Sequence, residues 1–166
     1  MTNFHTFRDD DPGVHSNALL FRQVHDLFDK YKKTHSCGII MRDLWENKEL
    51  WYLLVTKPNI EICLHGLDHI DYGVASYEKI VEDIKESLEY WRVRVGRGYG
   101  ADKVKPIKKF YPPWHSTSTI LEKACKDCGL ELDARREPDG VFCFHYWEAI
   151  DPQRLINLEK IISEKA

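Results

Sequence analysis

Short apolar runs alternate along the chain with longer segments in which apolar residues recur every three or four positions. The short runs are typical of buried strands. They cover residues 4–8, 38–41, 60–65, 107–111, 130–132 and 141–145. The longer segments predict amphipathic helices, because their apolar residues fall on one helical face. They cover residues 16–33, 46–56, 76–94, 118–128 and 151–163.

The order of these elements is β-α-β-α-β-α-β-α-β-β-α. Alternation of strands and helices is typical of βαβ units, which form parallel sheets with right-handed crossovers. The periodicity fits an open sheet and a barrel equally well. The chain contains no internal repeat and no low-complexity boundary. We therefore expect a single α/β domain over residues 1–166.

Capping residues support several of the helix boundaries. Ser16 or Asn17 is a suitable N-cap for the first helix. Asp151 and Pro152 fit the N-cap and first helical position of the last one. Gly129 fits the position that closes the 118–128 helix.

The composition is that of a soluble globular protein. Apolar residues make up 43% of the 166 residues and charged residues 31%, so a disordered chain or a coiled coil is excluded. No apolar run approaches the ~20 residues of a membrane helix, and the N-terminus does not resemble a signal peptide. The five cysteines are an odd number, which favours reduced thiols and predicts a cytoplasmic protein.

Ionisable residues follow several of the predicted strands. Three aspartates at residues 9–11 follow the first strand, His65 and His69 lie at the end of the third, and His145 ends the last. Segment 112–115, Pro-Pro-Trp-His, follows the fourth. Parallel strands bring their carboxyl ends to one edge of the sheet, where active sites of α/β folds assemble. These residues are therefore expected to share one cleft.

Two readings of these residues remain open on sequence alone. The acidic run fits a solvated turn as well as a cation site, since Asp, Pro and Gly favour turns. Histidines four residues apart can bind one metal, but Gly66 stands where a helical metalloprotease would carry its glutamate. Two histidines and a carboxylate from another strand would complete a three-ligand zinc site with an open position.

The combination of these motifs resembles the polysaccharide deacetylases, the family 4 carbohydrate esterases. The resemblance covers residues 4–148 and rests on the order of the motifs. It implies a distorted, incomplete (β/α) barrel that removes acetyl groups from N-acetylated sugars with a divalent metal ion, zinc being our expectation. By this resemblance Asp9 is the catalytic base and Asp10, His65 and His69 hold the metal. His145 corresponds to the general acid.

The same resemblance places segment 110–114 along one wall of the substrate groove. Tyr111, Pro113 and Trp114 are the substrate-binding residues expected there, with Trp147 as a further stacking surface for a sugar. Tyr111 also stands where the family usually carries an arginine that orients the catalytic aspartate. Arg8 is expected to point away from Asp9, because neighbouring residues of a strand face opposite sides.

The other departures concern two acidic positions. Asp11 stands where the family commonly has glycine. Asp133 is the candidate for the late acidic residue that tunes the acid histidine.

The segment from residue 92 to residue 109 is strongly basic. It contains seven basic residues and one acidic residue, although the whole chain carries a net charge of −3. Such a segment fits either a solvated helix end or a contact with an anionic substrate or nucleic acid. No membrane contact is expected.

The sequence thus predicts a metal-dependent hydrolase of a C–N bond that deacetylates an N-acetylated sugar or a related small molecule. Two alternatives stay open. One is a hydrolase of another amide or ester on an anionic substrate. The other is a non-catalytic module that binds a carbohydrate or metabolite. A homo-oligomer in which a partner subunit closes the barrel is compatible with the short chain.

Overall fold

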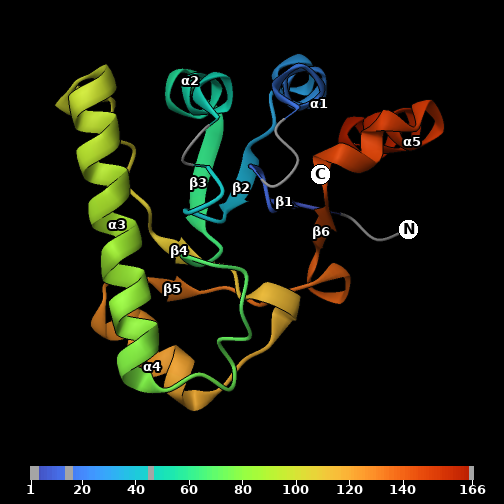
Figure 1. The fold of residues 1–166 in the computed structure, drawn as a ribbon. Helices are drawn as coiled ribbons and strands as arrows, with labels where there is room; N and C mark the ends of the chain where they lie inside the picture. The colour runs from blue at the N-terminus through green and yellow to red at the C-terminus, as the bar shows by residue number, and fades with distance from the viewer. Residues whose placement is uncertain (1–3, 14–16, 45–46, 165–166) are drawn as a thin grey trace.

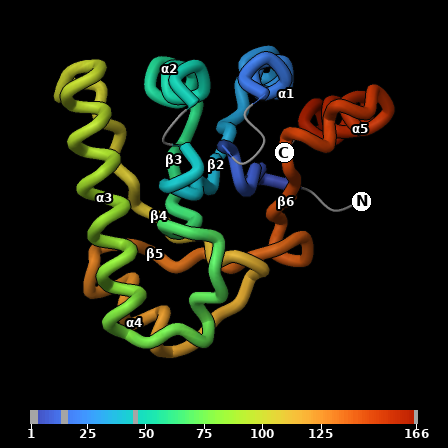
Figure 2. The backbone as a smooth tube through the Cα atoms, viewed as in Figure 1, coloured from blue at the N-terminus to red at the C-terminus, as the bar shows by residue number. Residues whose placement is uncertain are grey.

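A six-stranded parallel sheet forms the centre of the computed structural model, which describes residues 4–13, 17–44 and 47–164. The strands follow the order β5-β4-β3-β2-β1-β6 and curl into a half-barrel (Figures 1 and 2). They are β1 (Thr6–Asp10), β2 (His35–Ile39), β3 (Ile60–Leu64), β4 (Lys109–Phe110), β5 (Glu131–Leu132) and β6 (Val141–Phe144). The predicted incomplete barrel is confirmed.

The described residues form five α-helices around this sheet (Figure 1). They are α1 (Ala18–Tyr31), α2 (Lys48–Thr56), α3 (Tyr77–Tyr99), α4 (Thr119–Asp127) and α5 (Pro152–Ser163). Helix α1 contacts both α2 and α5, and α3 packs against α4. The main core lies between the sheet and these helices, where Phe7 of β1 meets Phe28 of α1 edge to face.

Local sequence explains where the helices begin. Asn17 accepts a hydrogen bond from the backbone N–H of Leu20 and is the N-cap of α1. Asp151 caps α5, with Pro152 at its first position, as the sequence predicts. Ser16 and Glu46, the first residues of two predicted helices, lie outside the described residues.

The element order is as predicted, and the boundary that matters for function is that of β1. The sequence pattern ends the first strand at Arg8, but β1 continues through Asp10 because Asp9 and Asp10 pair with β2. Arg8 and Asp10 therefore lie on one face of the strand, and Phe7 and Asp9 on the other. Asp11 becomes the first residue after the strand.

The basic segment lies at the far end of the sheet from the strand ends that carry the aspartates and histidines. Its first part is the last two turns of α3. Lys105 donates hydrogen bonds to the carbonyl groups of Leu54, Lys57 and Ile60, and Ile60 is the first residue of β3. Burial lowers the pKa of this Lys105 amine to about 8. The segment thus has a packing role at Lys105.

Length and apolarity decide whether any of the helices could span a membrane. Within the described ranges, none of them is both long enough and apolar enough to cross a bilayer.

Candidate metal centre and catalytic site

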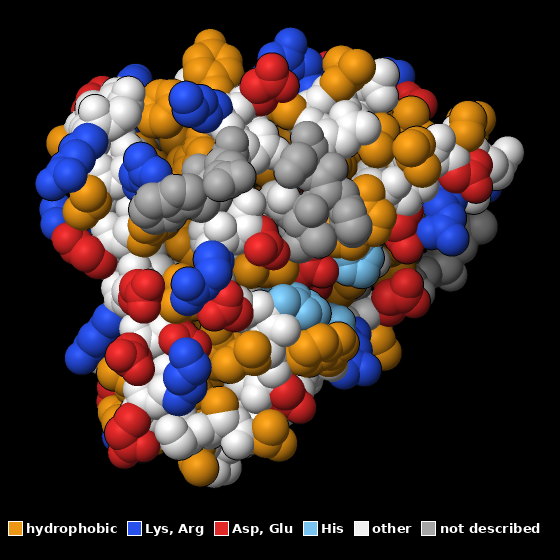
Figure 3. Space-filling view, viewed as in Figure 1, with side chains coloured by type: hydrophobic (Ala, Val, Ile, Leu, Met, Phe, Trp, Pro, Cys, Tyr) orange, Lys and Arg blue, Asp and Glu red, His pale blue; other side chains and the backbone are white. Residues whose placement is uncertain are grey.

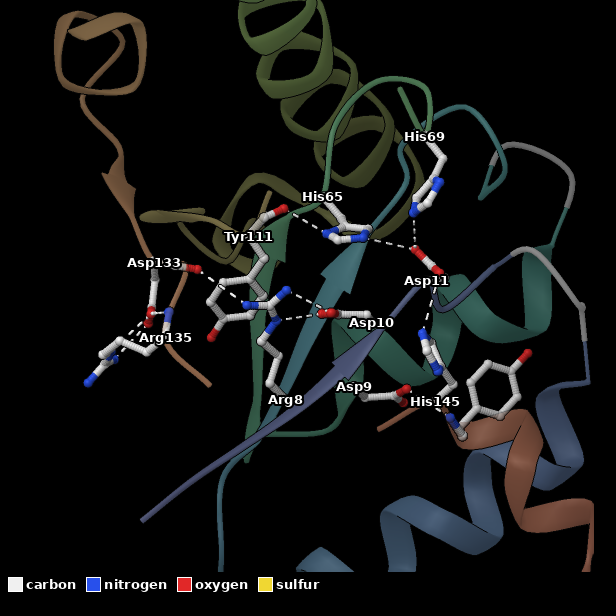
Figure 4. Close-up of polar contacts among 11 residues, drawn as sticks. Arg8, Asp9, Asp10, Asp11, His65, His69, Tyr111, Asp133, Arg135 and His145 are labelled. Carbon is white, nitrogen blue, oxygen red and sulfur yellow. Dashed lines mark hydrogen bonds and ion pairs between the residues drawn. The ribbon is translucent and has the colours of Figure 1, made fainter. Parts of the chain in front are cut away.

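Histidine and acidic side chains gather near the middle of one face of the molecule (Figure 3). The close-up in Figure 4 shows that they come from the carboxyl ends of β1, β3 and β6. The three consecutive aspartates at the end of β1 each have different partners.

Asp10 pairs with Arg8 and lies on the inner face of the half-barrel. The Nε and Nη2 atoms of Arg8 each donate to one Asp10 oxygen at 2.7 Å, so the ion pair is bidentate. Arg8 also donates from Nη1 to the carbonyl oxygen of Asp133 at 3.3 Å. Its guanidinium carbon lies 4.3 Å from the centre of the Tyr111 ring. Arg8 is 1% exposed, so this arrangement is fixed by burial.

Asp11 is the aspartate that faces the histidines. Its Oδ1 atom lies 3.1 Å from Nε2 of His65 and 3.5 Å from Nε2 of His69. Its Oδ2 atom lies 3.7 Å from Nε2 of His145. The backbone of Asp11 has a φ of 61°, in the left-handed region that aspartate tolerates better than most residues. This turn directs the carboxylate out of the line of the strand and toward the two imidazoles.

The imidazole of His65 is oriented by its second nitrogen. Nδ1 lies 2.6 Å from the carbonyl oxygen of Tyr111, which can only accept, so Nδ1 carries the proton. The other ring nitrogen, Nε2, faces Asp11. A hydrogen bond from the other ring nitrogen to a carbonyl is the arrangement found in metal-ligating histidines.

The residues present fit a divalent metal ion. Oδ1 of Asp11 is buried and has no hydrogen-bond partner among the described residues, although two imidazole nitrogens face it. Buried polar atoms are rarely left in this condition. One carboxylate and two histidines form the three-ligand set typical of catalytic zinc. Asp11, His65 and His69 also offer ligand atoms within 4.8 Å of one another.

A second group of metal-capable side chains, Asp9, His35 and Cys37, lies on the opposite face of the sheet and is fully buried. Here the carboxylate, the imidazole and the thiol all make hydrogen bonds that meet ordinary geometry. Asp9 Oδ2 lies 3.1 Å from His35 Nε2, and the Cys37 thiol donates to the carbonyl of His35. Burial raises the pKa of the Cys37 thiol well above its usual value, which disfavours the thiolate that a metal requires. The Asp11 group is the better candidate.

These contacts place two of the aspartates differently from the sequence prediction. Asp10, predicted as a metal ligand, points to Arg8, and Asp11 takes its place beside His65 and His69. Asp9, predicted as the base, is 0% exposed and bonded to His35 and to the backbone N–H of Tyr146, so its carboxylate is not accessible to a substrate. The cause is the longer β1. Because the strand continues through Asp10, Asp9 and Asp10 point to opposite faces of the sheet, and Asp11 is the first residue beyond the strand.

The predicted substrate-binding residues divide into two kinds. Trp114 is 60% exposed and lies edge-on to His69, with ring centres 4.4 Å apart. Its φ of 52° is in the left-handed region, which a bulky residue adopts only when its surroundings impose it. Tyr111 and Pro113 are buried, so they support the wall from within. Trp147 stacks on His145 with ring centres 4.5 Å apart.

Asp133 lies on the Arg8 side of the site, away from His145 (Figure 4). Its carboxylate accepts two hydrogen bonds from the Arg135 guanidinium, at 2.9 and 2.6 Å. The residue named from the sequence as a partner of the acid histidine thus contacts the opposite half of the site.

Arg8 and Asp11 are the site residues that sequence reasoning missed. Arg8 does point away from Asp9, as expected, but this places it on the same face as Asp10. The signal was the turn at Pro12 and Gly13, which allows a strand to continue to residue 10. With that boundary, the i and i+2 spacing of Arg8 and Asp10 predicts that the two side chains face the same way.

Gly38 of β2 forms the floor of the site and provides a first test of its packing. A Cβ atom there would lie 3.0 Å from Oδ1 of Asp10 and 3.1 Å from Cδ2 of Tyr111. Both neighbours are held by Arg8 and cannot move aside. We expect Gly38→Ala to reduce the free energy of unfolding by ~1–3 kcal/mol, as overpacking does, in a urea titration.

Gly98→Ala is the matched control for this substitution. Gly98 lies in α3, and nothing lies within 4 Å of the place that an alanine methyl group would take. Alanine there should stabilise the protein by ~0.5–1 kcal/mol, since glycine is unfavourable in a helix. Equal effects of the two substitutions would show that the floor of the site is not tightly packed.

Comparison with known proteins supports the fold. None of the sequence models of protein families matches the chain, and neither does any curated protein. Among solved structures, a family 4 carbohydrate esterase from Streptomyces lividans in complex with acetate is similar, with a TM-score of 0.69 at 14% identity. The similarity covers 97% of this chain and 88% of that one. The peptidoglycan deacetylase PdaC from Bacillus subtilis has a TM-score of 0.68 at 12% identity, over 97% and 82% of the two chains.

A family 4 pseudoenzyme from Bacillus anthracis is also similar, with a TM-score of 0.67 at 16% identity over 96% of this chain. A mutant of a pseudoenzyme of this family with restored enzymatic activity has a TM-score of 0.68. This chain spans 62% of the length of the first structure and 64% of the second. At these identities the likeness concerns the fold. It confirms the resemblance to the family 4 carbohydrate esterases that the motifs indicate.

Proposed function

We propose that this chain, which has the fold of the family 4 carbohydrate esterases, is a metal-dependent hydrolase that deacetylates an N-acetylated sugar or a related amide. The observation that carries the proposal is the buried Oδ1 atom of Asp11, which faces the Nε2 atoms of both His65 and His69. Asp10 with Arg8 and the imidazole of His145 flank this atom on two sides (Figure 4).

Asp11, His65 and His69 would hold the metal, for which zinc is our first choice. When bound, such an ion supplies Lewis acidity and lowers the pKa of water toward neutrality. The hydrogen bond from His65 Nδ1 to the carbonyl of Tyr111 orients the ring so that Nε2 points toward Asp11.

Asp10 is the proposed general base. Arg8 holds both of its oxygens at 2.7 Å, so the largely buried carboxylate has one orientation and its charge is compensated. Each oxygen keeps a second lone pair, which can accept a proton from the attacking water. In this proposal Arg8, from β1, takes the orienting role that the family gives to an arginine at the place of Tyr111.

His145 is the proposed general acid. Its Nε2 atom lies 3.7 Å from Oδ2 of Asp11, and its side chain is 40% exposed, so a proton can be delivered to the departing nitrogen. Trp147 stacks on the ring and limits its rotation. The exposed indole of Trp114, on the other side of His69, offers a flat apolar surface for a sugar ring.

Metal removal tests the proposal. We expect protein loaded with zinc and dialysed to retain about one ion per chain, measured by ICP-MS, and to release acetate from N-acetylated chitooligosaccharides. A chelator should abolish the release, and added metal should restore it, because the ion supplies the Lewis acidity that amide hydrolysis needs here.

Protein that is folded yet binds no metal would contradict this function. Protein that binds metal and is protected by the oligosaccharide against heat unfolding, but releases no acetate, would favour the non-catalytic binding module. The alternative of an anionic substrate has no support from the basic segment, since Lys105 anchors that segment at the far end of the sheet.

A further inference from the structure

Asp9 is a buried carboxylate for which the proposed mechanism has no use. It lies on the outer face of β1, next to α1, and is 0% exposed. Burial raises its pKa well above the usual value, and the hydrogen bond from Tyr146 opposes this only in part. A carboxyl group at such a position is unfavourable unless its hydrogen bonds fix something that an apolar side chain could not.

One oxygen of Asp9 reaches the backbone immediately after the acid histidine. Oδ1 accepts a hydrogen bond from the N–H of Tyr146 at 2.9 Å. The β1–β6 pairing ends with Asp9 opposite Phe144, so this side chain continues the ladder where the backbone pairing stops. His145 is the residue between the last pair and this hydrogen bond.

The other oxygen of Asp9 is held in place by His35. Oδ2 lies 3.1 Å from Nε2 of His35, and Nδ1 of His35 lies 3.3 Å from Nδ1 of His25. The ring of His35 stacks on that of Phe28, with centres 4.3 Å apart. The carboxylate therefore has a single orientation, with one oxygen toward the helix layer and the other toward Tyr146.

The imidazole of His145 is restrained from both directions. Asp9 fixes the peptide that follows it, and Trp147, two residues on, stacks on its ring. With the backbone and the ring both held, Nε2 of His145 lies 3.7 Å from the second oxygen of Asp11. Misplacement of a catalytic group by about 1 Å can cost ~10²-fold in rate, so this anchoring bears on activity.

We propose that Asp9 is a positioning residue for His145, acting through the backbone N–H of Tyr146 and held by His35. This inference rests on the proposed function. It gives the three consecutive aspartates distinct roles, in which Asp9 anchors the acid, Asp10 is the base and Asp11 binds the metal. The general acid thus depends on a residue in β1, at the other end of the chain.

Two substrates that differ in leaving group test this assignment. An N-acetylated sugar needs a proton on its departing nitrogen, whereas 4-nitrophenyl acetate releases a phenolate that needs none. We expect Asp9→Leu to lower kcat on the amide by ~10-fold or more and to change kcat on the aryl ester by less than about twofold. Asp9→Asn, whose amide oxygen can still accept from Tyr146, should restore most of the amide activity.

Two reference variants complete the comparison. His145→Ala should show the same difference between substrates with a larger loss on the amide, ~10²–10⁴-fold. Ser87→Ala removes a buried hydrogen bond within α3, far from the site, and should show no such difference. Bound zinc should stay at one ion per chain in all of them, because none of these residues belongs to the Asp11 group.

Other outcomes would overturn the inference. An equal loss on both substrates would make Asp9 merely structural, and a loss of zinc with Asp9→Leu would assign Asp9 to a metal site. If Asp9→Leu does not fold, Asp9→Ser replaces it in the comparison, because the serine side chain is too short to reach the N–H of Tyr146. Wild-type protein inactive on both substrates would overturn the proposed function and this inference together. Active wild-type protein, with Asp9→Leu losing no more activity on the amide than on the aryl ester, would overturn the inference alone.

Discussion

Asp11→Ala is expected to abolish metal binding, and Asp10→Asn to leave it intact. Asp11 carries the buried oxygen between His65 and His69, whereas Asp10 points to Arg8. Zinc measured by ICP-MS after dialysis should fall from about one ion per chain to near zero in Asp11→Ala. Amide hydrolysis should fall by ~10²-fold or more in this variant, as expected when a group that stabilises developing charge is lost.

Asp10→Asn is the matched partner of this experiment, because it alters the adjacent aspartate without changing its size. Its activity should fall by ~10²–10⁴-fold, the usual contribution of a general base, while zinc stays bound. Zinc lost from Asp10→Asn and retained in Asp11→Ala would restore the assignment that the sequence motifs suggest. Full activity in Asp10→Asn would show that another group is the base.

Arg8→Met is expected to give the largest loss of stability. Arg8 and Asp10 form a bidentate ion pair in which the side chains are 1% and 11% exposed. Removing one partner of a buried pair leaves an uncompensated charge and typically costs ~3–5 kcal/mol. The free energy of unfolding in urea should fall by this amount, and amide hydrolysis should fall as well, because Asp10 loses its fixed orientation.

A double-mutant cycle separates the two effects. Arg8→Met combined with Asp10→Asn removes both charges and should recover much of the stability, but no activity. Arg92→Met is the matched surface control. Arg92 also makes a bidentate contact, with Glu89, but both side chains are more than half exposed. Its loss should hardly affect unfolding, and a similar effect of Arg8→Met would mean that the Arg8 pair is screened by solvent.

The fold could be inferred from the sequence to a large extent. The signals used were local: apolar periodicity, the caps at Asn17 and Asp151, and the turn residues between elements. The structure contains both caps. The strand edge that carries the site follows from the same pattern. The motifs also named His65, His69 and His145, which the structure brings together around one carboxylate.

The roles of the three aspartates could not be inferred in this way. All three are chemically identical, and their sequence neighbours fit a strand ending at residue 8 or at residue 10. The choice depends on pairing with β2 and β6, where Asp9 meets Cys37 on one side and Phe144 on the other. Since successive side chains of a strand alternate between faces, the position of the strand end decides which aspartate points into the cleft.

Arg8 and Tyr111 illustrate the same limit. By its resemblance to the family, the sequence shows tyrosine at residue 111 where an arginine is expected. The structure shows the Tyr111 ring beneath the guanidinium of Arg8, which is bonded to Asp10. Residues 8 and 111 lie far apart in the sequence, and only the curl of the sheet brings them into contact.

The sequence by itself therefore determined the α/β class, the order of the elements, and the set of histidines and aspartates from which a site could be built. Those properties depend on local periodicity and on residue type. Only the tertiary structure decided that Asp11 faces the histidines, that Asp10 pairs with Arg8, and that Asp9 anchors the turn after His145. These contacts depend on strand register and on the curl of the sheet, which many residues set jointly.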